Sequence, residues 1–116
     1  MDINGNLSVK HLSITGSATP TLIEDGVYIS ITTTGAGQVF RLPDASLFPG
    51  RIYILRNVSN VDDAIISSIG AGIEFFAGNN STAGTTTVDL AGANITTKTL
   101  IFISDGSNWT YGHLGF

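Results

Sequence analysis

Residues 21–34, TLIEDGVYISITTT, decide the fold class of this chain. They predict a strand, a tight turn at Asp25-Gly26, and a second strand in which Val27, Ile29 and Ile31 alternate with more polar neighbours. An Asp-Gly pair supplies the positive backbone angles that a two-residue hairpin loop requires. The stretch therefore predicts a β-hairpin with one apolar face.

Runs of the same kind fill the rest of the chain. Turns rich in Gly and Pro separate them, and no window places apolar residues at helical spacing. Roughly ten short strands at this spacing predict an all-β fold, either an antiparallel β sandwich or a barrel-like head. The runs lie at 38–42, 51–59, 64–69, 73–77, 85–92 and 100–111.

Two of these runs carry more specific expectations. The run RIYILRNVS at 51–59 is strongly apolar, so we expect it near the centre of a sheet. The run LIFI at 100–103 is apolar at every position, which predicts a strand buried on both faces. A turn at Asp105-Gly106 then leads into a last strand that carries Trp109 and Tyr111 on the same face.

Composition narrows the class of protein. The 116 residues suit one domain with a single modest core. Only 12% of residues are charged, and the polar positions are filled by Thr, Ser, Asn and Gly, which suit pleated sheets better than helices. There is no cysteine, which excludes disulfides and thiolate chemistry.

The charge balance limits the partners. The net charge is −4 and the five basic residues are scattered, so we expect no nucleic-acid partner. Arg41 and Arg56 could instead pair with Asp44 or Asp62. There is no signal segment, and no apolar run approaches the roughly twenty residues of a membrane span, so no membrane insertion is expected.

No constellation of catalytic or metal-binding residues is apparent. The two histidines lie at opposite ends of the chain, and no Ser, His and Asp spacing or nucleophile elbow occurs. The acidic pairs Glu24-Asp25 and Asp62-Asp63 lack the spaced carboxylates of a calcium loop and are expected to be solvated turns. The sequence therefore predicts no enzyme, no catalytic residue, no metal and no cofactor.

The N-terminal segment predicts self-association. Residues 1–16 alternate small apolar and polar residues, but they carry too little apolar mass to be stable alone. The segment needs partners, and other copies of the chain are the nearest ones. We therefore divide the chain into an assembly stem, 1–16, and a β-sandwich head, 17–116. The predicted oligomer interface consists of Leu7, Val9, Leu12 and Ile14.

Aromatic residues give the candidate ligand site. Trp109 and Tyr111 could stack on sugar rings, or the single Trp could cap the core or lie in a subunit interface. Phe75 and Phe76 raise a related question, because adjacent residues of a strand point to opposite faces of the sheet. One of the two must be covered by something other than its own core.

Two stretches resemble a known group of modules. The passage GQVFRLPDASLFPGRIYILRNVSN at 37–60, with LIFISDGSNWTY at 100–111, resembles modules of bacteriophage fibre and head-fibre proteins. The resemblance covers about residues 21–112. INGNLSV at 3–9 resembles the short lead-in of trimeric phage fibres.

The resemblance implies a structural and adhesive function. The expected protein is a homotrimeric virion module, a fibre or head-decoration domain that is made in the host cytoplasm. Its expected partners are its own copies, other virion proteins and a host-surface glycan. The alternative is a free, lectin-like carbohydrate-binding module that uses Trp109 and Tyr111.

Overall fold

The computed structural model describes residues 8–78, 83–94 and 97–113, which form ten strands and one short 3-10 turn. The all-β prediction is confirmed. The strands are β1 (His11–Thr15), β2 (Thr21–Leu22), β3 (Tyr28–Thr32), β4 (Val39–Leu42), β5 (Ile52–Asn57), β6 (Ala64–Ser68), β7 (Phe75–Ala77), β8 (Val88–Leu90), β9 (Thr99–Ser104) and β10 (Trp109–Gly112), and the turn η1 (Ala45–Leu47) follows β4.

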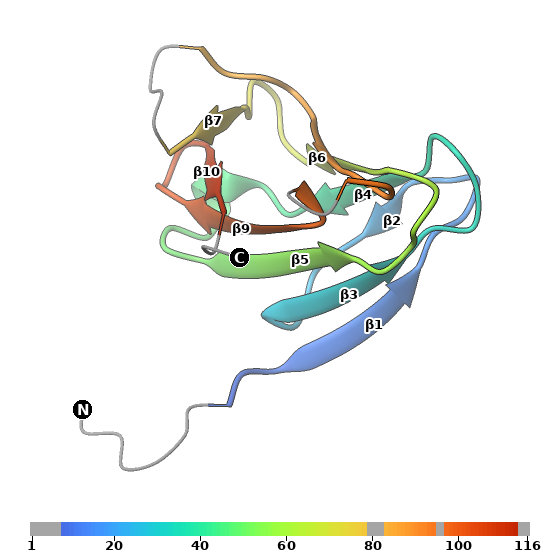
Figure 1. The fold of residues 1–116 in the computed structure, drawn as a ribbon. Coiled ribbons are helices and arrows are strands. Elements are labelled where there is room, and N and C mark those ends of the chain that lie inside the picture. Colours follow the sequence, from blue (N-terminus) through green and yellow to red (C-terminus); the bar gives the residue numbers. More distant parts are fainter. Residues whose placement is uncertain (1–7, 79–82, 95–96, 114–116) are drawn as a thin grey trace.

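The strands form two sheets (Figure 1). The six-stranded sheet has the order β1-β3-β5-β9-β10-β7, and the four-stranded sheet has the order β2-β4-β6-β8. From β1 to β9 the chain changes sheet at every step, so only β9 and β10 form a hairpin of consecutive strands. The prediction that β5 lies inside a sheet is confirmed, because it lies between β3 and β9.

The hairpin predicted for residues 21–34 is wrong, because β2 and β3 belong to different sheets. Gly26 does take the positive φ of 83° that a turn needs. Before this turn, however, Ile23 is buried in the core, and the Tyr53 hydroxyl donates to the Glu24 carbonyl at 2.9 Å. These two contacts hold the segment between β2 and β3 where it passes from one sheet to the other.

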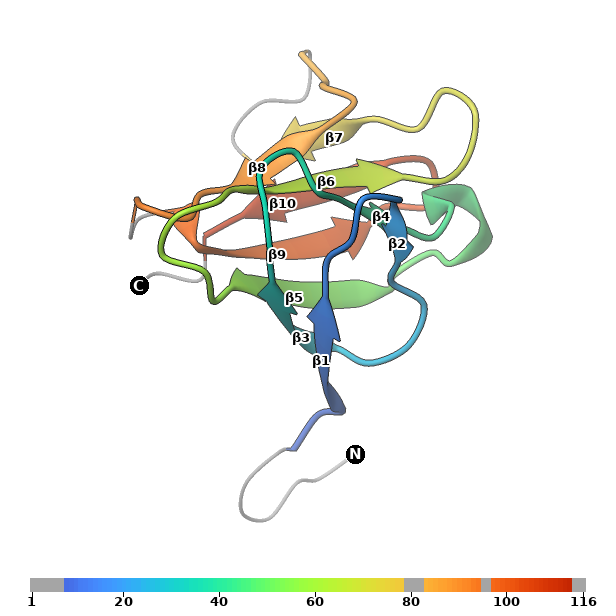
Figure 2. The ribbon, with the colours of Figure 1, turned by 90° about the vertical axis from the view of Figure 1, so that its right-hand side faces the viewer.

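The antiparallel prediction also fails for most strand pairs. Five pairs are parallel, namely β1-β3, β3-β5, β2-β4, β4-β6 and β7-β10. Only β5-β9, β9-β10 and β6-β8 are antiparallel. In the first four of the parallel pairs the chain crosses to the other sheet between the two strands and runs in its original direction when it returns (Figure 2).

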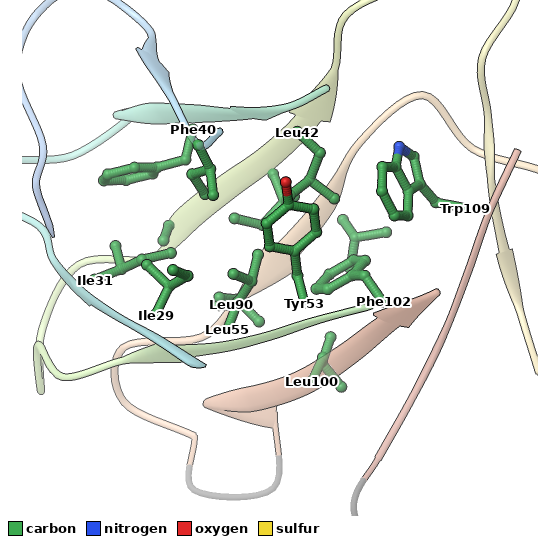
Figure 3. Packing of buried hydrophobic residues seen from close by; sticks show 14 of the residues in the cluster. Ile29, Ile31, Phe40, Leu42, Tyr53, Leu55, Leu90, Leu100, Phe102 and Trp109 are labelled. Atoms are coloured by element: carbon green, nitrogen blue, oxygen red, sulfur yellow. The ribbon is translucent and has the colours of Figure 1, made fainter. Parts of the chain in front are cut away.

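One hydrophobic core lies between the sheets, and both contribute every second residue to it (Figure 3). Ile29, Phe40 and Leu90 illustrate the predicted alternation, which is confirmed in β3, β4 and β8. The strand β9 is not buried on both faces as predicted: Leu100 and Phe102 are buried, whereas Ile103 is 38% exposed. The core cluster comprises Ile23, Ile29, Ile31, Phe40, Leu42, Ala45, Tyr53, Leu55, Ala64, Ile66, Phe75, Val88, Leu90, Leu100, Phe102 and Trp109.

The N-terminal strand β1 belongs to the head rather than to a separate stem. It pairs in parallel with β3, from His11 opposite Tyr28 to Thr15 opposite Thr32, and forms the edge of the six-stranded sheet. A boundary at residue 16 is therefore wrong for residues 11–15. Although β1 has little apolar mass, a half-buried edge strand needs only the apolar side chains on one face.

The predicted interface residues separate into three groups. Leu12 and Ile14 pack against the core of their own chain, so the premise that they lack an intrachain partner is wrong. Val9 is 45% exposed. Leu7 lies outside the described residues.

Candidate functional site

The outer face of the six-stranded sheet carries an apolar band. We define the apolar band as the outward residues Tyr28, Ile52, Ile54, Phe76, Ile101 and Ile103.

The strand register makes the band continuous across β3, β5 and β9, whereas Thr110 lies between Ile103 and Phe76. Ile52 lies opposite Ile103, and Ile54 lies opposite Ile101 on one side and Tyr28 on the other. Ile52 and Ile103 are 42% and 38% exposed, and the other four members are half-buried. A β-sheet normally presents polar residues on the face that meets water, so this band is the candidate interaction surface of the sheet.

Charges are nearly absent from this face. Among the outward residues of its six described strands, only Arg56 and His11 can carry a charge, and none is a carboxylate. The remaining outward positions are mostly Ser and Thr. Three described carboxylates border this face: Glu24 and Asp25 line a hollow that Ile52 also lines, and Glu74 lies with Phe76 against Gly84.

A hollow of about 490 Å³ lies at the point where β1, β3 and β5 begin, lined in part by Val9, Gly26 and Ile52. The Lys10 ammonium pairs with the Asp25 carboxylate at this hollow. The hydrogen bond from the Lys10 ammonium and a second one from the Gly26 amide lower the pKa of the Asp25 carboxyl. The hollow thus places Val9 and Ile52 beside charged residues, which also include Glu24 and Arg51.

A second feature lies on the outer side of the four-stranded sheet, next to the β6–β7 turn. We call it the groove, a hollow of about 540 Å³. Its lining includes Arg41 on β4, Ser67 on β6, the turn residues Ile69 and Ile73, and Glu74 just before β7. Arg41 and Ser67 are neighbours in the sheet register.

The turn that borders the groove is held firmly. Gly70 has a φ of +109°, and a Cβ at this position would lie 2.6 Å from the Asp44 carboxylate. Asp44 in turn accepts from the Ser46 amide at 2.9 Å and caps η1. The close approach of turn and cap therefore requires a glycine.

The structure places Trp109 in the core, so of the alternatives left open by the sequence, its possible contact with a sugar is wrong. Its exposed fraction is 0%, its ring lies 5.7 Å from that of Tyr53, and its Nε1 donates to Ser68 Oγ at 3.0 Å (Figure 3). Burial of the indole with its N–H paired is the favourable arrangement for a residue with one large apolar body and one donor. The alternative that the single Trp caps the core is the one observed.

Tyr111 shares the inward side of β10 with Trp109. It packs on the core, and its ring stacks on that of Phe102 with centroids 6.0 Å apart. It also lines a hollow of about 370 Å³ with Leu100 and His113. The two aromatics therefore do not form an exposed pair.

Phe75 and Phe76 do point to opposite faces of β7. Phe75 is buried and meets Phe102 edge to face at 5.8 Å, whereas Phe76 belongs to the apolar band. The other members of the apolar band were not predicted from the sequence. The available signal was that the runs 52–55 and 100–103 are apolar at both odd and even positions, which requires a cover on both faces.

Among the described residues, the suggested arginine ion pairs, a cluster of metal ligands and a membrane-spanning helix are all absent. The only ion pair there is Lys10–Asp25, so the suggested pairing of Arg41 and Arg56 with Asp44 or Asp62 does not form. In the described ranges, no group of three or more His, Asp and Glu side chains could hold a metal ion. Nor does that part of the chain contain a helix long and apolar enough to span a membrane.

Comparison with protein families, with characterised proteins and with solved structures finds no match to this chain.

Proposed function

We propose that this chain is a structural virion module, a phage fibre or head-decoration domain, whose copies associate through the outer face of the six-stranded sheet. The head is a two-sheet β sandwich in this account, and the assembly is a homotrimer. The observation that carries the proposal is the apolar band. The virion setting and the number three rest on the resemblance of residues 21–112 to phage fibre modules.

The chemistry of the outer face supports a second copy as the occupant. Each chain carries a net charge of −4, so copies repel one another unless their acidic groups stay away from the contact. The outward strand residues meet this condition, because none of them is acidic, and of the two carboxylates that border the face at the hollow, Asp25 is paired with Lys10. Its six strands give it a width of about 24 Å, since neighbouring strands lie about 4.8 Å apart.

The position of the N-terminal segment also supports this occupant. The described chain begins at Ser8, and Val9 lines the same hollow as Ile52 at one end of the apolar band. The segment that the sequence suggests as an assembly element thus joins the head beside the band. A contact between copies on this face would continue into that segment.

The test is the mass of the particle in solution. Sedimentation of the full chain should give a particle of three times the 12.1 kDa of one chain. Ile103→Asp should shift that particle to a folded monomer, because it places a charge in the centre of an apolar contact.

The control is Val61→Asp, on a residue that is 79% exposed outside the strands. It should leave the assembly intact. A monomeric wild-type chain at micromolar concentration would overturn the proposal. An Ile103→Asp assembly as stable as the wild type would show that the copies meet elsewhere.

The alternative, a lectin-like module, has one specific observation in its favour, which is the groove beside Arg41 and Glu74. The two functions are compatible, since Arg41 and Ser67 of the groove lie on the outward side of the sheet opposite to the apolar band. A chain that binds sugar but sediments as a monomer would favour the free lectin.

A further inference from the structure

The groove contains polar side chains that the fold leaves without partners. Ser67 Oγ is buried and has no hydrogen-bond partner. Arg41 and Glu74 line the same hollow, yet neither forms an ion pair within the described part of the chain. A buried hydroxyl without a partner costs about 1–3 kcal/mol, so this part of the groove wall lowers the stability of the fold.

The walls of the groove are anchored from behind by the β9–β10 hairpin. Trp109 Nε1 donates to Ser68 Oγ at 3.0 Å, and the Trp109 amide donates to the Glu74 carbonyl at 3.0 Å. Asn108 Oδ1 accepts from the Glu74 amide at 2.9 Å. Glu74 is therefore held by its backbone on both sides. Its carboxylate lies against Gly84, and no ion pair of the described residues involves it.

We propose that the groove is a saccharide-binding site. Arg41 offers hydrogen-bond donors and Glu74 offers acceptors, which matches the mixed donors and acceptors of neighbouring sugar hydroxyls. Ile69, 40% exposed, and Ile73 supply an apolar contact for the C–H face of a sugar ring.

The charges narrow the ligand class. A simple anion would meet the Glu74 carboxylate, and a simple cation would meet the Arg41 guanidinium, whereas a neutral polyol pairs with both. The volume of about 540 Å³ lies within the range of small-ligand sites, of about 300–1,000 Å³. A neutral mono- or disaccharide is the ligand class that fits.

This inference deepens the proposed function and rests on it only for its setting: the groove would be where the assembled module touches a host-surface glycan. Because Arg41 and Ser67 of the groove lie on the other sheet, all copies could present that part of it outward while their apolar bands are covered. Trp109 then acts as a positioning residue rather than as the stacking platform that the sequence suggested.

The test uses the full chain on an array of immobilised sugars: glucose, galactose, mannose, rhamnose and N-acetylglucosamine, with sialic acid and glucuronic acid as acidic comparisons. We expect selective retention on one or more neutral sugars. The retained sugar is then titrated in solution, with amide NMR shifts as the readout. The shifts should map to residues 67–74.

Glu74→Gln should weaken the binding of the retained sugar by about tenfold or more, because a hydrogen bond to a charged acceptor is lost. Glu24→Gln is the matched control, since it removes an exposed carboxylate at the hollow near Val9 and should leave binding unchanged. Melting temperatures of both variants report whether they fold.

Silence on the whole array, or equal affinity of wild type and a folded Glu74→Gln, would overturn the saccharide site. Retention on the acidic sugars alone would overturn the neutral ligand class. These outcomes are independent of particle mass. Intact assemblies without sugar binding would leave the proposed function standing, and sugar binding by a monomer would overturn self-association instead.

Discussion

The buried hydroxyl of Ser67 gives a prediction about the stability of the fold. Its hydroxyl is buried without a partner, so it contributes a desolvation cost and no compensating hydrogen bond. We expect Ser67→Ala to keep or raise the free energy of unfolding, by up to about 1 kcal/mol. Denaturant unfolding at fixed protein concentration measures this change.

Ser104→Ala is the comparison for that experiment. Ser104 Oγ is also buried, but it donates to the Ala45 carbonyl at 2.7 Å. Its removal should lower the free energy of unfolding by about 1–2 kcal/mol, since a carbonyl is left unpaired. A loss of the same size in Ser67→Ala would mean that the Ser67 hydroxyl already has a partner within the protein.

Tyr53 makes the stability of the fold depend on pH in the alkaline range. Burial raises the pKa of Tyr53 above its ordinary value of 10.0, although the nearby Arg51 opposes this shift. Because the folded pKa is higher than the unfolded one, the contribution to stability is complete below about pH 10 and is lost as the pH rises through the folded pKa.

Tyr53→Phe should therefore reduce the fall in stability above pH 10. It should also lower stability at neutral pH by about 1 kcal/mol, because the hydrogen bond to the Glu24 carbonyl is lost. Unfolding curves from pH 7 to pH 11 test both effects. Tyr28→Phe, on the outer face, leaves Tyr53 in place and should give the wild-type pH profile; an unchanged alkaline fall in Tyr53→Phe would refute the assignment.

At the scale of elements, the sequence predicts the strands better than their partners. The period of two in 28–32 and 39–42 depends only on which residues avoid water, so it is visible in the chain itself. Pairing depends on contacts between distant residues. Nothing local in 21–34 distinguishes a hairpin from a crossing to the other sheet, because both begin with a Gly turn.

The two candidate surfaces also differ in whether they depend on local sequence or on the pairing of distant strands. The apolar band could have been predicted from 52–55 and 100–103, because strands that are apolar on both faces need a cover on both. The groove could not, since it depends on the parallel register that places Arg41 beside Ser67. The burial of Trp109 was one of two readings that the sequence alone leaves open.

The edge strand β1 gives a test at this scale. Leu12 packs against the core although it lies in the segment first assigned to a stem. Leu12→Ala should lower the free energy of unfolding by about 1–2 kcal/mol, less than for a fully buried leucine. Deletion of residues 1–16 should lower the melting temperature much further, because it removes all of β1 and uncovers β3.

Leu47→Ala is the matched control for Leu12→Ala, because Leu47 is 69% exposed in η1. It should change stability by less than about 0.5 kcal/mol. Equal, small effects of both substitutions would contradict the packing of β1 on the head.

At the scale of the whole molecule, the two sheets have opposite outward chemistries. The six-stranded sheet presents an apolar surface without carboxylates, whereas the four-stranded sheet presents Arg41, Ser67 and, nearby, Glu74. A module that associates through the first sheet keeps the second exposed. This division would let one small domain combine assembly with recognition.

The most direct test of the central claim is thiol labelling of single-cysteine variants, which is clean because the chain has no cysteine. Ile103→Cys lies in the apolar band, and Val61→Cys provides a fully accessible reference. If copies meet on this face, the assembled Ile103→Cys should react at least about tenfold more slowly than Val61→Cys, and equally fast once the protein is unfolded. Equal rates in the assembled protein would contradict the account, because the outer face would then be open to water.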